Sequence, residues 1–186
     1  WFAYVEATEP SLMTAAYHTW EPMFIHALEG GDAADVSVFH DYSSDDGDER
    51  TTTQIQLDLL TMDLDAIVWM LSDLDTTGHA YGFSPSVPEY VAEMEDIDRQ
   101  VGMVLEAITA RETYESEDWM VILSTDHAGS GTGHGYNIPE HRLVPFFIWS
   151  SSVTPGLLWP SPNAVSVVST AIDHLGIDIN DEAALK

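Results

Sequence analysis

Three apolar runs constrain the fold of this chain more than any other feature. They cover residues 66–71, 119–123 and 144–149, and two shorter strand-like runs cover residues 14–18 and 36–39. A run that is apolar at successive positions suits a strand buried on both faces, as in a parallel sheet that helices cover on both sides. The runs therefore predict a layered sheet.

Helical patterns separate these runs, in residues 21–28, 49–61, 86–111 and 163–175. The pattern is strongest in residues 86–111, where Ser86 and Glu89 fit a capping box and Pro88 suits the first turn. Residues 72–82 are expected to form a polar loop. Strands that alternate with helices predict an α/β fold with a mostly parallel sheet flanked by helices. The 186 residues suit a single domain.

The charge of the chain excludes one class of function. There are 32 acidic residues against 5 basic ones, a net charge of −27. Such a chain repels nucleic-acid backbones, so we expect no nucleic-acid binding through charge. The acidic excess is explained by solubility in salt, by a surrounding rich in divalent cations, or by a basic partner. No apolar run reaches the length of a transmembrane segment.

Potential metal ligands directly follow two of the predicted strands. They are Asp73, Asp75 and His79 after one strand, and Asp126, His127 and His134 after the other. Ligands of an open parallel sheet bind beyond the carboxyl ends of its strands, so both groups are expected at one edge. The glycines between Gly129 and Gly133 allow His134 to fold back over the site.

Each group alone has a simpler interpretation. Asp73 is better explained as a turn cap than as a ligand, Asp75 with His79 as an ordinary loop pair, and Asp126 with His127 is ambiguous. The set as a whole, placed at two strand ends, favours metal binding. The chain has no cysteine, so oxygen and imidazole ligands must hold the ion, which suits zinc, manganese or iron.

At these residues the sequence resembles a known family. The segments DLDTTGHAYG (73–82) and STDHAGSGTGHG (124–135) look like the metal-binding half of the alkaline phosphatase superfamily. The best resemblance is to its type I phosphodiesterase/nucleotide pyrophosphatase branch. The helix with Glu95-Asp96-Ile97-Asp98 and the segment HRLVPFFIWSSSVTPG (141–156) also fit. The resemblance covers the chain from about Pro10 onward and implies an alkaline-phosphatase-like fold.

The resemblance implies a site with two divalent metal ions, most often zinc. Matched by position, Asp75, His79 and His134 would hold one ion, and Asp126 with His127 would hold part of the other. The family's Thr or Ser nucleophile and a further metal-binding Asp precede the matched region. No residue of this chain takes the nucleophile's place. We therefore expect residues 1–186 to be a single partial domain, incomplete on its N-terminal side and paired with the missing half or with another chain.

The expected function is metal-dependent hydrolysis of a phosphodiester or pyrophosphate bond in a small-molecule phosphoester. A non-catalytic structural or interaction module that retains the fold is the main alternative, and a complete minimal hydrolase is a third. Phosphomonoesterase, sulfatase and mutase relatives share these metal motifs, so the motifs leave the substrate open. The resemblance favours an extracellular or secretory location.

Overall fold

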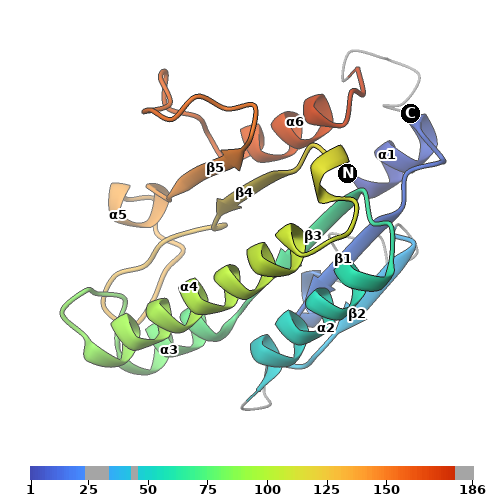
Figure 1. Ribbon diagram of the computed structural model, residues 1–186. Coiled ribbons are helices and arrows are strands. Elements are labelled where there is room, and N and C mark those ends of the chain that lie inside the picture. Colours follow the sequence, from blue (N-terminus) through green and yellow to red (C-terminus); the bar gives the residue numbers. More distant parts are fainter. Residues whose placement is uncertain (24–33, 43–45, 179–186) are drawn as a thin grey trace.

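The computed structural model describes residues 1–23, 34–42 and 46–178 (Figure 1). Its strands are β1 (Thr14–His18), β2 (Val36–Phe39), β3 (Ala66–Met70), β4 (Met120–Ser124) and β5 (Phe146–Ser150). Its helices are α1 (Phe2–Thr8), α2 (Gly47–Thr61), α3 (Asp73–Tyr81), α4 (Pro88–Thr109), α5 (Pro139–Arg142) and α6 (Val165–His174), with a 3-10 turn η3 (Tyr114–Ser116). Among the helices of these ranges, none combines the length and apolarity that crossing a membrane requires.

Three strands form a parallel sheet in the order β2-β1-β3. β1 is the central strand, with Ala15 opposite Val36 on one side and opposite Ile67 on the other. All five residues of β1 are buried. A parallel sheet flanked by helices confirms the predicted fold class.

β4 and β5 form a separate antiparallel pair, with Ile122 opposite Ile148 at its centre. The sequence predicted a single layered sheet from alternating strands and helices, and for this pair the prediction is wrong. The connection between β4 and β5 contains only the one-turn helix α5. A parallel crossover needs a longer helical connection, so the chain reverses instead.

Helices cover the parallel sheet on both faces, as Figure 1 shows. Ala15 and Tyr17 of β1 pack against α2 and α4 through Ile55, Leu59 and Ile108. The next residue of β1, Ala16, faces the opposite way and packs against Phe2 of α1. Because successive side chains of a strand point to opposite faces of the sheet, one part of the core lies on each face.

The helices differ from the predictions in several places. Residues 73–81, expected to be a loop, form α3. Helix α4 begins at Pro88, two residues after the predicted start at Ser86. Its N-cap is Val87 and no side chain caps it, so the predicted capping box of Ser86 and Glu89 is wrong. Helices α1 and α5 were not predicted, and most of the predicted helix at 21–28 lies outside the described residues.

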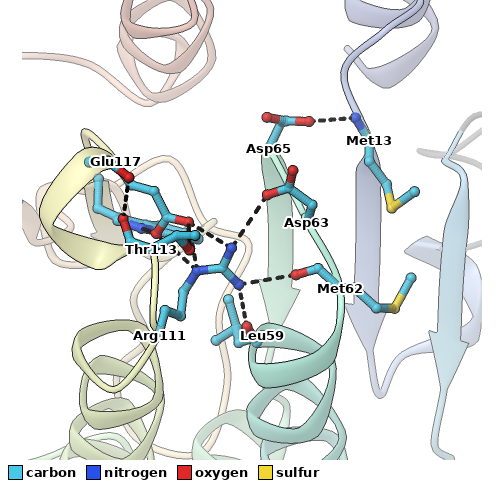
Figure 2. A network of polar contacts seen from close by, with 10 residues as sticks. Met13, Leu59, Met62, Asp63, Asp65, Arg111, Thr113 and Glu117 are labelled. Carbon is cyan, nitrogen blue, oxygen red and sulfur yellow. Dashed lines mark hydrogen bonds and ion pairs between the residues drawn. The ribbon is translucent and has the colours of Figure 1, made fainter.

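A buried arginine joins the ends of α2 and α4 to the start of β4 (Figure 2). The guanidinium of Arg111 donates to the backbone oxygens of Leu59 and Met62 at the end of α2. Its Nε and one terminal nitrogen bind Glu117 at 2.7–3.0 Å. Trp119, directly before β4, donates its indole N–H to Glu117 at 2.6 Å. Only 7% of the Arg111 side chain and 20% of the Glu117 side chain are exposed, so this ion pair is largely shielded from water.

The Glu117 carboxylate makes part of the fold sensitive to acid. Its hydrogen bonds to Arg111 lower the pKa of Glu117 to about 2. A depressed carboxyl pKa contributes stability that is complete above the unfolded-state value and is lost as pH falls through the folded-state value.

We expect Glu117→Gln to reduce the unfolding free energy by about 1–2 kcal/mol at pH 7, a figure discounted for partial exposure. The difference between Glu117→Gln and wild type should shrink between about pH 4.5 and pH 2. Urea unfolding of both proteins from pH 7 to pH 2 measures it. A difference that stays constant over this range would contradict the assigned cause.

Candidate metal centre

Helix α3 presents two of the predicted ligands on one face. Asp75 and His79 are four residues apart, a spacing that places side chains on the same side of a helix. The His79 Nε2 lies 3.4 Å from the Asp75 Oδ2. The sequence predicted a loop at these residues, and a helix brings the two side chains together instead.

The glycine-rich loop after β4 brings a second pair of residues to the same place. Gly131 has a φ of 57° and an isolated bridge joins Ser130 to Gly133, so the chain turns back on itself here. His134 then stacks on His127, with ring centroids 3.7 Å apart. The loop thus folds His134 back over the site, as predicted.

Four side chains from the two segments meet in one cluster. The His134 Nε2 lies 3.1 Å from the Nε2 of His79 and 3.6 Å from the Oδ1 of Asp75. One ligand atom from each of Asp75, His127 and His134 lies within 4.8 Å of the other two. The two predicted groups of ligands therefore do meet, although one group lies on a helix and the preceding strands β3 and β4 belong to different sheets.

The cluster fits a divalent metal ion. Two nitrogen ligands held at about 2.0–2.1 Å by a tetrahedral ion are roughly 3.3 Å apart, close to the distances within this cluster. The Asp75 Oδ1 and the His127 Nδ1 are buried without a hydrogen-bond partner in the described structure. Buried polar atoms are nearly always satisfied, and a cation bound here would satisfy both of these atoms.

A backbone carbonyl orients His79 for this role. The His79 Nδ1 lies 3.0 Å from the Thr132 oxygen, which can only accept a hydrogen bond. The proton is thereby placed on Nδ1, which leaves a lone pair on Nε2 directed into the cluster. Metal-binding histidines typically donate their other ring nitrogen in this way.

The fifth predicted ligand, Asp126, lies at the margin of the cluster. Its Oδ2 is 3.7 Å from the His127 Nε2, its Oδ1 accepts the backbone N–H of His127, and its side chain is 65% exposed. The sequence assigned His127 to a second ion together with Asp126. The structure places His127 between Asp126 and the other three ligands.

A buried carboxylate, which the sequence analysis did not identify, binds the N-terminal end of α3. Asp48, the second residue of α2, is fully buried. Its carboxylate accepts the backbone N–H groups of Ser72 and Asp73 at 2.9–3.0 Å. These groups belong to the first turn of α3, whose N–H groups have no partner within the helix. No local sequence pattern reveals this role, because Asp48 belongs to the acidic run SSDDGDE (43–49), which is typical of a solvent-exposed loop.

Asp73 is part of this support and lies in an acidic environment. Desolvation by burial, followed by the negative charges of Asp48, Glu93 and Asp96, raises the pKa of Asp73 to about 7. Asp73 is the first residue of α3. Its predicted role as a turn cap is wrong, because Asp48 from another helix binds the N–H groups.

Ser130 and His141 form a pair that resembles a nucleophile and its base. The Ser130 Oγ lies 2.7 Å from the His141 Nε2. However, the Tyr136 N–H donates to the Nδ1 of the same ring at 3.2 Å, so the neutral imidazole carries its proton on Nε2 and donates to Ser130. A base must present a lone pair to the hydroxyl. His141 therefore holds the loop in place and does not activate Ser130.

The comparisons with known proteins concern the same stretch of chain. A protein-family model described as Sulfatase matches residues 12–177. No curated protein and no solved structure matched the chain. The matched stretch contains the whole cluster together with Asp126.

Proposed function

Because the chain belongs to the sulfatase family, a member of the alkaline phosphatase superfamily of hydrolases, we propose that it is the metal-binding part of a hydrolase acting on phosphodiester or pyrophosphate bonds. The observation that carries this proposal is the cluster of Asp75, His79, His127 and His134, with its two unsatisfied buried atoms. A scaffold has no need for such a set. We propose two divalent zinc ions, which suit the oxygen and imidazole donors, with Asp126 reaching the second.

Divalent ions in such a site stabilise the charge that develops on the ester oxygens and lower the pKa of a bound water. The residues of this chain fix the position of that charge. Asp75 and His79 are held on a rigid helix, and the Thr132 carbonyl fixes the tautomer of His79.

We further propose that a segment outside residues 1–186 completes the catalytic unit and carries the nucleophile. Within the described residues, β3 and β4 each keep one edge without a strand partner. Ile67 and Trp69 of β3 and Val121 of β4 pack against the same core cluster but are only partly buried. Free edges flanked by half-buried apolar side chains suit an added strand.

A sulfate ester is a second candidate substrate, because the matching family model is the sulfatase one. Phosphodiesters and sulfate monoesters both carry a single negative charge, whereas a phosphate monoester carries up to two. A chain with a net charge of −27 repels the doubly charged substrate more strongly. Phosphate monoesters are therefore the least favoured of the three.

The test compares hydrolysis of bis(4-nitrophenyl) phosphate, 4-nitrophenyl sulfate and 4-nitrophenyl phosphate. The enzyme is the longest polypeptide that contains residues 1–186, loaded with zinc or manganese. We expect hydrolysis of the diester that a chelator abolishes and added metal restores. Faster turnover of the sulfate ester would support the second candidate. Metal loading without turnover of any ester would favour the non-catalytic module.

A further inference from the structure

A phenyl ring lies between the two segments that carry the metal ligands. A Cβ atom added to Gly78 of α3 would lie 2.3 Å from the Cε1 of Phe83, and one added to Gly129 of the loop would lie 2.5 Å from its Cγ. Real Cβ atoms do not approach other atoms so closely. Neither glycine has a positive φ, so the backbone alone would accept any residue. As the ring of Phe83 lies here, it leaves no room for a Cβ atom at either position.

The backbone turns sharply to bring Phe83 to this place. Gly82, the residue after α3, has a φ of 123° and donates its N–H to the Gly78 oxygen at 2.9 Å. Phe83 then donates its own N–H to the Gly131 oxygen at 2.7 Å. The end of α3 and the glycine-rich loop are thereby joined through both the backbone and the ring.

The same ring also contacts two of the ligands. It meets His79 edge to face, with centroids 5.4 Å apart at 83°, and His134 with centroids 6.0 Å apart at 89°. Tyr90 of α4 packs against the ring at 5.8 Å. Phe83 is therefore supported from α4 and in contact with one ligand from each segment.

We propose that Phe83 is a positioning residue, a spacer that sets the separation of α3 from the glycine-rich loop and hence of His79 from His134. This inference rests on the proposed metal centre. Phe83 offers no donor atom to a metal and takes no part in chemistry. A smaller side chain would let the two segments shift relative to each other, and a Cβ at Gly78 or Gly129 would push the ring and the ligands apart.

The first experiment tests the role of Phe83 as a spacer by comparing the melting temperatures of variants in the metal-free state. Gly129→Ala is expected to lower the melting temperature by several degrees, on the usual scale of about 2–4 °C for each kcal/mol in a chain of this length. Gly156→Ala is the matched control, because Gly156 lies outside the glycine-rich loop, nothing lies within 4 Å of a Cβ added there and its φ is not positive. It should change the melting temperature by about a degree at most.

A double-mutant cycle then identifies the ring as the cause. In the Phe83→Leu background, which keeps an apolar side chain at this position, Gly129→Ala should lower the melting temperature much less than in wild type. An equal effect of Gly129→Ala in both backgrounds would overturn the proposal.

The second experiment measures the consequence for the ligands. Cobalt titration followed by its visible absorption reports both affinity and ligand geometry. We expect Phe83→Leu and Gly129→Ala to weaken cobalt binding by about 10- to 100-fold, as supporting residues of metal sites do. They should also change the band pattern, whereas Gly156→Ala should match wild type. Unchanged affinity and spectra in Phe83→Leu would overturn the proposal.

The two experiments separate this inference from the proposed function. If the wild-type protein takes up no cobalt, the proposed function fails, and the coupling in the metal-free protein still decides whether the ring is a spacer. If wild type binds cobalt and both variants bind it equally well, the proposed function stands and the spacer is wrong.

Discussion

His79→Ala is expected to abolish metal-dependent hydrolysis and to weaken metal binding more than any other single substitution on α3. The ring of His79 on α3 contacts the glycine-rich loop at two points, through Nε2 to His134 at 3.1 Å and through Nδ1 to the Thr132 oxygen at 3.0 Å. Alanine removes a ligand and also the contact that ties α3 to the loop.

The size of the effect follows from what a metal contributes. A bound ion supplies several kcal/mol of transition-state stabilisation, and about 4 kcal/mol corresponds to a rate factor of roughly 1000. Loss of a direct ligand should weaken metal affinity beyond the 10- to 100-fold that supporting residues contribute. Elemental analysis of the purified protein and a zinc competition titration measure the binding, and ester hydrolysis measures the rate.

His174→Ala is the matched control. His174 ends α6, and its Nε2 lies 2.8 Å from the Asp118 oxygen, so it belongs to a different part of the chain. The control should retain wild-type metal content. A His79→Ala protein with full metal content, affinity and stability would refute the metal centre.

Arg111→Met is expected to cause the largest loss of stability. The substitution leaves the Glu117 carboxylate without its cation and the Leu59 and Met62 oxygens without their donor. Removing one partner of a buried ion pair costs about 3–5 kcal/mol. Because 20% of the Glu117 side chain is exposed, water can reach it, and we expect the lower end of that range.

A loss of about 3 kcal/mol corresponds to a melting temperature lower by about 6–12 °C in a chain of this length. Thermal unfolding by circular dichroism measures it. Arg50→Met removes an exposed ion pair with Asp46 and should change stability by about 0.5 kcal/mol or less. Equal destabilisation by both substitutions would show that the buried network has no special role. The double variant Arg111→Met/Glu117→Gln should recover part of the loss, since it removes the uncompensated charge.

The sequence predicted the strands well because their signal is local. Each strand buried between helices must be apolar at successive positions, and β3 and β4 lie within the predicted runs or differ from them by a single residue. Strand pairing is not local. The antiparallel partnership of β4 with β5 depends on the connection between them, which apolar runs do not describe.

Helix α3 shows the opposite case. Its sequence, DLDTTGHAY, contains two threonines and a glycine, which are weak helix formers, and few apolar residues. The helix depends on Asp48, 24 residues before Ser72, for the hydrogen bonds of its first turn. This tertiary contact outweighs the low helix propensity of the segment. It cannot be inferred from the sequence of α3 alone.

The ligands were predictable in position but not in arrangement. Their residue types and their place after two strands indicated one site, and the structure brings four of the five together. That all five bind metal stays a prediction. The grouping of His127 with Asp75 and His134 depends on ring stacking between His127 and His134. The need for glycine at position 78 depends on the ring of Phe83, and sequence spacing cannot reveal such a contact.

The central place of β1 has a consequence for synthesis of the chain. β1 needs β3 as its neighbour, with Thr14 opposite Ala66, yet β3 follows about 50 residues later. At translation rates of about 5–20 residues per second, that edge of β1 stays without its partner for roughly 2–10 seconds. During this interval the nascent chain exposes a strand whose residues are all buried in the finished protein. Ribosome-associated chaperones should therefore engage this chain early, before the ligand-bearing α3 has been made.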